Sequence, residues 1–127
     1  MIPYISISHD VRVTVRPVYL DGQSDVLTSR FVFGYYVRIE NEGFDDVQLL
    51  RRHWRITDAT GRIEEVEGEG VIGQQPVIAP GAFHEYNSYS VLKTFTGTME
   101  GSYLMERSRG DRFQVAIPRF HLQAASN

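Results

Sequence analysis

Three glycines in the middle of the chain have the spacing of a phosphate-binding loop. Gly68, Gly70 and Gly73 form the pattern G-x-G-x-x-G, which in dinucleotide-binding proteins holds a pyrophosphate at the start of a helix. That chemistry needs a strand before the loop and a helix opening at its end. Pro80 and Gly81 follow instead, and they would interrupt a helix that began at Gly73. The segment is therefore predicted to be a glycine-rich connection in a β protein.

A weaker form of phosphate binding stays open for this segment. Successive glycine N–H groups can form an anion-binding nest without a helix, and Arg51 or Arg52 would bring positive charge beside Gly68, Gly70 and Gly73. These five residues are the candidate ligand-binding site, with a nucleotide polyphosphate or a metal–phosphate complex as the expected ligand. The alternative is structural, because glycines also allow a sharp bend or a crossover between sheets.

A row of carboxylates precedes the glycines. Glu65, Glu67 and Glu69 would project from one side of a strand, where their oxygens could bind a hard cation such as Mg²⁺. The alternative is a ladder of ion pairs, because the turn ending in Gly61 predicts a hairpin with a defined register. That register has four cross-strand pairs: Trp54 with Val66 on one face, and Arg55 with Glu65, His53 with Glu67 and Arg51 with Glu69 on the other. The ladder is the preferred interpretation, and no metal site is predicted.

No arrangement of residues in the sequence indicates catalysis. The four histidines occur singly and in none of the zinc-binding spacings: His9, His53, His84 and His121. No G-x-S-x-G motif surrounds Ser88 or Ser90, and the chain has no cysteine. We therefore expect no catalytic residues, no cofactor and no enzymatic activity.

Residues 86–99 form an uncharged stretch, apart from Lys93, that is rich in Tyr, Ser and Thr. Aromatic and hydroxyl side chains of this kind are common in partner-binding surfaces. They are equally typical of an ordinary β core and its turns. Both interpretations stay open at this point.

The composition limits the domain count and the classes of partner. A chain of 127 residues with 42% hydrophobic content is expected to form one domain, and a net charge of −3 gives no attraction to nucleic acids or anionic membranes. No apolar run approaches the 18 residues of a membrane span, and the first residues do not resemble a signal peptide. The absence of cysteine fits the cytoplasm, which is the expected location.

The elements that would position these residues are strands. Val11, Val13 and Val15 alternate with polar residues, and residues 31–39 place Phe31, Phe33, Tyr35, Val37 and Ile39 on one side. Further strand-like runs lie near 46–58, 62–67, 82–91 and 99–107, and the last strand, 113–117, is expected to stop at Pro118. Short strands separated by turn residues predict an all-β antiparallel sandwich. Long strand edges would permit a homodimer, which the charges of Arg12 and Arg16 would oppose.

Several sequence blocks taken together resemble the ApaG family. They extend from about residue 9 to 122 and occur in this order: 37–43 (VRIENEG), 47–58 (VQLLRRHWRITD), 66–76 (VEGEGVIGQQP), 80–81 (PG), 97–103 (GTMEGSY) and 117–122 (IPRFHL). The resemblance implies a single ApaG domain over 1–127, with a core at about 9–122 and flexible termini such as the small, polar tail 123–127.

The resemblance also implies a fold and a biological context. The fold is an immunoglobulin-like or fibronectin type III-like β-sandwich, and the family is cytoplasmic, bacterial and associated with cobalt tolerance and magnesium efflux. Its use as an appended module in other proteins implies protein interaction, and it has no established catalytic residues. The leading hypothesis is a non-enzymatic binding domain with an unknown protein partner. The alternative is a small-ligand binder for a nucleotide polyphosphate or metal–phosphate at the Gly68–Gly73 loop.

Overall fold

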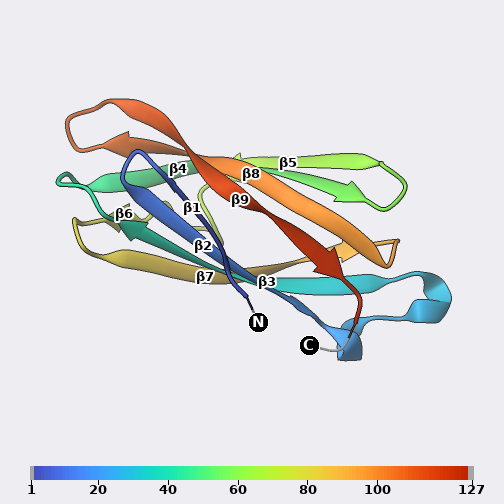
Figure 1. The fold of residues 1–127 in the computed structure, drawn as a ribbon. Helices are drawn as coiled ribbons and strands as arrows, with labels where there is room; N and C mark the ends of the chain where they lie inside the picture. The colour runs from blue at the N-terminus through green and yellow to red at the C-terminus, as the bar shows by residue number, and fades with distance from the viewer. Residues whose placement is uncertain (1, 126–127) are drawn as a thin grey trace.

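The computed structural model describes residues 2–125 and consists almost entirely of strands (Figure 1). The strands are β1 (Tyr4–Ser8), β2 (Val11–Tyr19), β3 (Phe31–Asn41), β4 (Val47–Asp58), β5 (Ile63–Glu69), β6 (Val77–Ile78), β7 (Phe83–Leu92), β8 (Thr96–Arg107) and β9 (Arg112–Gln123). Two short 3₁₀ turns, η1 (Asp21–Gln23) and η2 (Val26–Thr28), connect β2 to β3. In the described part of the chain, no helix is of a length and apolarity that would cross a bilayer.

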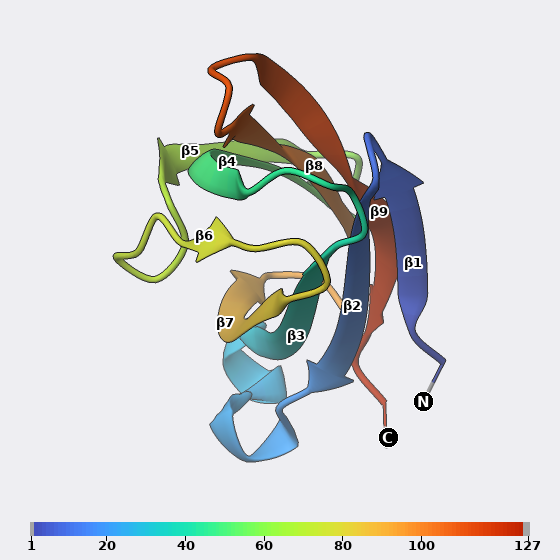
Figure 2. The ribbon, with the colours of Figure 1, turned by 90° about the vertical axis from the view of Figure 1, so that its left-hand side faces the viewer.

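The strands form two sheets that pack face to face, as the view in Figure 2 shows. The first sheet has the order β1-β2-β3-β7, and the second has the order β5-β4-β8-β9 with β6 paired to β4. Every strand pair is antiparallel. The predicted all-β antiparallel sandwich is confirmed.

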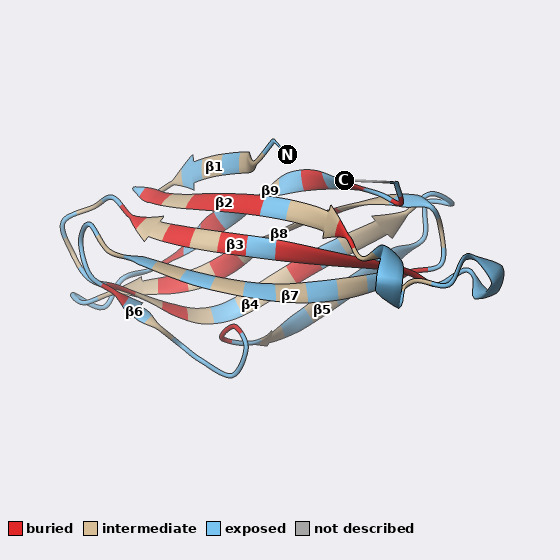
Figure 3. Cartoon of the chain, turned by 90° about the horizontal axis from the view of Figure 1, so that it is seen from below, coloured by how far each residue is buried: buried red, intermediate tan, exposed pale blue. Residues whose placement is uncertain are grey.

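Alternating side chains of both sheets fill the space between them. The five alternating apolar residues predicted for one side of β3, Phe31 to Ile39, are all buried (Figure 3). Tyr35 meets Trp54 of the opposite sheet with ring centroids 5.2 Å apart, and Trp54 meets Phe120 edge-on at 5.9 Å. Such aromatic pairs add to the burial energy and lock the two sheets in one arrangement.

The hairpin between β4 and β5 has the predicted register. Arg51 pairs with Glu69, His53 with Glu67, Trp54 with Val66 and Arg55 with Glu65. The turn is fixed by a positive φ of 88° at Gly61 and by the Asp58 carboxylate, which accepts hydrogen bonds from the N–H groups of Thr60 and Arg62. Local turn chemistry and cross-strand pairing therefore agree, as the sequence indicates.

The sandwich is closed along one side and open along the other. On the closed side β1 lies beside β9 (Figure 2), where Ser6 donates to the Ala116 carbonyl at 2.8 Å and Ser8 accepts from the Ala116 N–H at 2.9 Å. On the open side the edge strands are β7 and β5, and no strand of the described residues joins them. The gap between the sheets opens along this β7–β5 side, where strand β6 pairs with the start of β4 at one end.

Pro118 does not end the last strand, contrary to expectation. Strand β9 continues to Gln123 because the pairing with β8 shifts by one residue, so that Pro118 and Arg119 together lie opposite Glu100. A bulge leaves a residue outside the hydrogen-bond ladder, and a proline, which has no N–H to donate, is tolerated there. The same shift moves the inward positions from odd numbers to even ones, so that Phe120 is buried.

The described part of the C-terminal tail packs on the fold, and the expectation of flexible termini stays a prediction. Gln123 belongs to β9, and Ala124 is buried and donates its N–H to the Phe95 carbonyl at 2.9 Å. Residues 1, 126 and 127, to which that expectation also applies, lie outside the described residues. Strand β1, which precedes the expected core at residue 9, pairs with β2 along its whole length.

Candidate functional site

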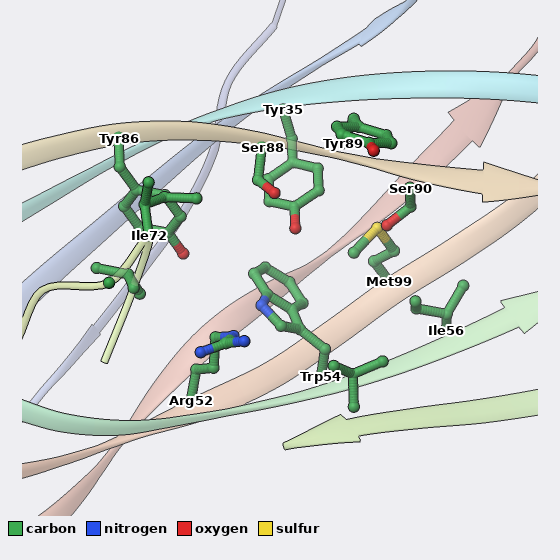
Figure 4. Close-up of a pocket in the computed structure, with 13 residues that line it drawn as sticks. Tyr35, Arg52, Trp54, Ile56, Ile72, Tyr86, Ser88, Tyr89, Ser90 and Met99 are labelled. Carbon is green, nitrogen blue, oxygen red and sulfur yellow. The ribbon is translucent and has the colours of Figure 1, made fainter. Parts of the chain in front are cut away.

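A cleft of about 260 Å³ lies between the two sheets on the open side (Figure 4). Strand β7 forms one wall, β4 the other, and the loop after β5 forms one end. Its lining is mostly aromatic, apolar or hydroxyl-bearing, and consists of Tyr35, Arg52, Trp54, Ile56, Val66, Val71, Ile72, Gly73, Tyr86, Ser88, Tyr89, Ser90 and Met99. Arg52 is the one charged side chain in that set.

A bulge in β4 turns Arg52 into the cleft. Val47 and Leu49 are buried, but the pairing with β8 then shifts by one residue at Leu50. Beyond the bulge the inward positions are even-numbered, so Arg52 and Trp54 point between the sheets (Figure 4). A bulge re-aims side chains in this manner because it inserts one residue into the period of two. Arg51 consequently points outward and is exposed.

The guanidinium of Arg52 is held by the backbone of the loop. Its Nη1 donates to the carbonyls of Glu69 at 3.1 Å and Gly70 at 3.0 Å. Gly68 leaves space for it, because a Cβ on Gly68 would lie 2.7 Å from Nη1. Among the described residues no acceptor is recorded for Nε or Nη2, and no carboxylate lies within ion-pair distance of Arg52. One edge of the guanidinium is therefore free to bind.

The tyrosine hydroxyls around Arg52 do not neutralise it. Burial raises the pKa of Tyr35. Its hydrogen bonds with Ser88 and Ser90, and the positive charge of Arg52, lower the pKa and offset the effect of burial only in part. Burial also raises the pKa values of Tyr86 and Tyr103, whose hydroxyls share a hydrogen bond. All three hydroxyls are therefore uncharged at neutral pH, since an ordinary tyrosine titrates near pH 10. The positive charge in the cleft is uncompensated by the described side chains.

The glycine loop bends sharply instead of opening a helix, as predicted. Its N–H groups are partly in use: Gly70 donates to the Leu50 carbonyl at 2.9 Å, while Val71 and Gln74 exchange bonds of 2.8 and 3.0 Å. Gly70 and Gly73 have positive φ angles, and so does Ile72, at 47°. Because three of these amides already have protein acceptors, the nest is at most partial. Polyphosphate binding by the loop stays a prediction.

The predicted site residues are only partly brought together. Arg52 and Gly73 line the cleft, and Gly68 lies against the guanidinium of Arg52. Gly70 is buried within the loop, and Arg51 lies on the outer face of its sheet.

On that outer face the glutamate ladder has ion-pair distances only at His53, whose imidazole carries a charge only when protonated, and among the described residues neither Arg55 and Glu65 nor Arg51 and Glu69 form an ion pair. The His53 Nε2 atom lies 3.4 Å from Glu65 and 3.9 Å from Glu67, and both carboxylates are largely exposed. Exposed pairs of this kind contribute roughly 0.2–1 kcal/mol. Within residues 2–125, no group of three or more His, Asp or Glu side chains is arranged to hold a metal ion.

Several cleft residues have no counterpart in the sequence-based site. Tyr35, Trp54 and Tyr86 come from three different strands, and their convergence depends on how the sheets pack. Two signals could have identified part of the cleft. The apolar positions change from odd at Val47 and Leu49 to even at Trp54, which indicates a bulge. The stretch 86–99 was predicted to be either an interaction surface or a structural element, and its first residues line the cleft.

Comparison with known proteins identifies the relatives of this chain. A family model described as the ApaG domain matches residues 21–107. The chain is 51% identical over 121 residues to the Protein ApaG of Rhodospirillum centenum and to that of Paramagnetospirillum magneticum, covering 95% of this chain and 93% of each relative. The crystal structure of the putative ApaA protein from Bordetella pertussis is 46% identical, with a TM-score of 0.88, covering 90% of this chain and 93% of that one.

Proposed function

The chain belongs to the ApaG family, and on that basis we propose that it is a non-enzymatic binding domain that takes an extended segment of a protein partner along strand β7. One observation carries the proposal: β7 is a long sheet edge that is not protected against pairing. Exposed strand edges pair readily with another chain, which is the basis of strand addition in peptide recognition.

The features that usually protect an edge are missing from β7. Its ten residues contain no lysine and no proline, and they pair with β3 without a bulge. Its one carboxylate, Glu85, is 3.8 Å from Arg38 of the neighbouring strand. Phe83, Tyr89 and Val91 are exposed along it. Strand β5, at the other edge of the open side, carries four glutamates and is protected by their charge.

Site-specific photo-crosslinking in cells tests the proposal. A photoreactive phenylalanine would replace Tyr89 on β7, a residue that is 63% exposed. In a matched control, the same amino acid would replace Ile63 on β5, a residue that is 47% exposed. We expect a discrete adduct from position 89 that position 63 does not give. Equal adduct patterns at the two positions, or no adduct at 89, would rule out β7 as the partner edge.

We also propose that the sandwich is of the immunoglobulin-like, fibronectin type III-like kind. The strand order supports this assignment: β2, β3 and β7 correspond to A, B and E of an immunoglobulin-like domain, and β4, β8 and β9 correspond to C, F and G. Strand β5 then occupies the position of C′ beside C. In this arrangement β7 is an E strand whose outer flank is open.

The association with cobalt tolerance and magnesium efflux comes from the family resemblance, and we propose that this chain acts on cations indirectly, through its partner in the cytoplasm. Calorimetric titration of the purified protein with Mg²⁺ and Co²⁺ tests this route. We expect no saturable heat at physiological concentrations. Stoichiometric binding of either ion would replace the indirect route with a direct one.

A further inference from the structure

We propose that the cleft is a binding site for a small monocarboxylate with an apolar body, whose carboxylate is held by the free edge of Arg52. This site shares residues 86–90 of β7 with the proposed partner edge, but it takes a free small molecule between the sheets rather than a protein segment along the strand. The proposal rests on the charge of the cleft, the nature of its walls and the conformation of its rim.

The charge of the cleft selects a monoanion. The Nε and Nη2 groups of Arg52 form the fork that matches a carboxylate bidentately, and their positions are set by the two bonds from Nη1 to Glu69 and Gly70. A single carboxylate would be neutralised by this one cation. A phosphate monoester carries about −1.5 to −2 at neutral pH, which is more negative charge than this one cation offsets. The lining of the cleft therefore favours a carboxylate over a phosphate.

The walls of the cleft select an apolar body of limited size. The indole of Trp54 and the ring of Tyr35 form its floor, and Met99 and Val71 add buried apolar surface. The hydroxyls of Ser88 and Ser90 project from β7 toward the same space (Figure 4). A volume of about 260 Å³ is below the roughly 300–1,000 Å³ of sites for drug-sized ligands. The cleft therefore suits a small ligand.

The rim of the cleft carries a β-branched residue in a two-residue turn that needs positive φ at both central positions, Ile72 and Gly73, between the bridged residues Val71 and Gln74. Ile72 is 62% exposed and has a φ of 47°, in the left-handed region that β-branched residues avoid. Strain of this kind persists where the surrounding structure fixes it, and it concentrates at ligand clamps. Its neighbours Gly70 and Gly73 fix the path of the loop on either side. The apolar side chain at position 72 is consequently presented to a ligand at the cleft mouth.

The fluorescence of Trp54, the only tryptophan of the chain, provides the test. The probe is phenylacetate, with 2-phenylethanol as the neutral analogue and inorganic phosphate as the polar anion. We expect a saturable change with phenylacetate in the millimolar range. Binding of the neutral analogue should be about tenfold weaker or more, because it lacks the charge-assisted bonds.

The adjacent arginines give matched variants. Arg52→Gln should weaken phenylacetate binding about tenfold or more, while Arg51→Gln, on the outer face, should leave it unchanged. Gly68→Ala is a second variant, because its Cβ would displace the guanidinium while Arg52 is retained. Thermal unfolding of each variant establishes that it is folded.

Three results would overturn the inference. They are the absence of a saturable signal with phenylacetate, equal affinity of the wild type and Arg52→Gln, and tighter binding of inorganic phosphate than of phenylacetate. None of them bears on the adducts expected at position 89, so the carboxylate site and the partner edge can fail independently.

Discussion

The glycines of the G-x-G-x-x-G segment differ in what prevents a side chain at each position, and alanine substitutions should reveal the difference. At Gly70 the φ is 61°, and a Cβ would lie 2.0 Å from the Gln74 carbonyl oxygen. At Gly73 the φ is 72°, but no atom lies within 4 Å of the added Cβ. The first position therefore combines a steric clash with a left-handed backbone, and the second has the left-handed backbone alone.

The expected magnitudes follow from these contacts. A left-handed alanine costs about 1–2 kcal/mol at either position. At Gly70 the Gln74 carbonyl must also move by about 1 Å or more to reach ordinary contact distance, which breaks its 2.8 Å bond from the Val71 N–H. Losing that bond adds about 1 kcal/mol. We expect Gly70→Ala to lower the free energy of unfolding by about 2–3 kcal/mol, and Gly73→Ala by about 1–2 kcal/mol.

Urea denaturation followed by Trp54 fluorescence measures both variants, since the tryptophan lies in the cleft beside this loop. Gly68→Ala completes the series: its backbone is not left-handed, so its main effect should be on Arg52 and on phenylacetate binding. If Gly70→Ala were as stable as Gly73→Ala, the close approach of Gln74 to Gly70 would not be the reason for this glycine.

Three further outcomes are expected. Because burial raises the pKa of Tyr103, the folded protein keeps a proton that the unfolded chain loses above about pH 10, so wild-type stability should fall with rising pH. Tyr103→Phe removes this one proton, so for each pH unit above about 10 the folding equilibrium constant of the wild type should fall by a factor about ten times larger than that of the variant. Urea titrations at several alkaline pH values measure the difference. Hydrogen bonds from Thr60 lower the pKa of Asp58, so the ionised carboxylate stabilises the fold above the ordinary carboxyl pKa, and this stabilisation is lost as the pH falls through the lowered value. The loss of unfolding free energy in Asp58→Ala relative to the wild type should therefore shrink with acidification. A loss that is independent of pH would contradict this. Ile72→Asn should raise the unfolding free energy by up to about 1 kcal/mol, because asparagine tolerates the left-handed region, and it should weaken phenylacetate binding; a less stable variant would show that Ile72 is not strained.

The parts of the structure that the sequence predicts are those set by local chemistry. The β4–β5 register follows from a glycine turn and from pairs that would all be spoiled by a shift of one residue. The buried face of β3 follows from the period of two. In both cases the deciding interactions are between residues close in sequence or within one strand, so the sequence pattern alone predicts the register and the buried face.

The cleft could not be predicted in the same way. Tyr35 and Tyr86 are brought together by the pairing of β3 with β7, and Arg52 faces them from the other sheet. Which strands become neighbours, and at what register the sheets stack, depends on non-local packing that a single sequence does not display. The position of Pro118 could not be predicted for the same reason. A proline locally indicates the end of a strand, but the pairing with β8 forms a bulge opposite Glu100 that accommodates it.

The bulge at Leu50 links the fold to the charge in the cleft. Without it, the inward positions after Leu49 would be Arg51, His53 and Arg55, and the indole of Trp54 would face solvent. The inserted residue allows Trp54 to be buried against Phe120, and it turns position 52 inward as a geometric consequence.

Nothing in that consequence requires an arginine at position 52. Arg52 is half-buried, and a neutral side chain would occupy this inward position with less desolvation. The loop supplies two carbonyls to Arg52, while the free edge of its guanidinium stays turned into the cleft. The fold therefore accounts for an inward side chain at this position but not for its positive charge, which the binding of a carboxylate would use.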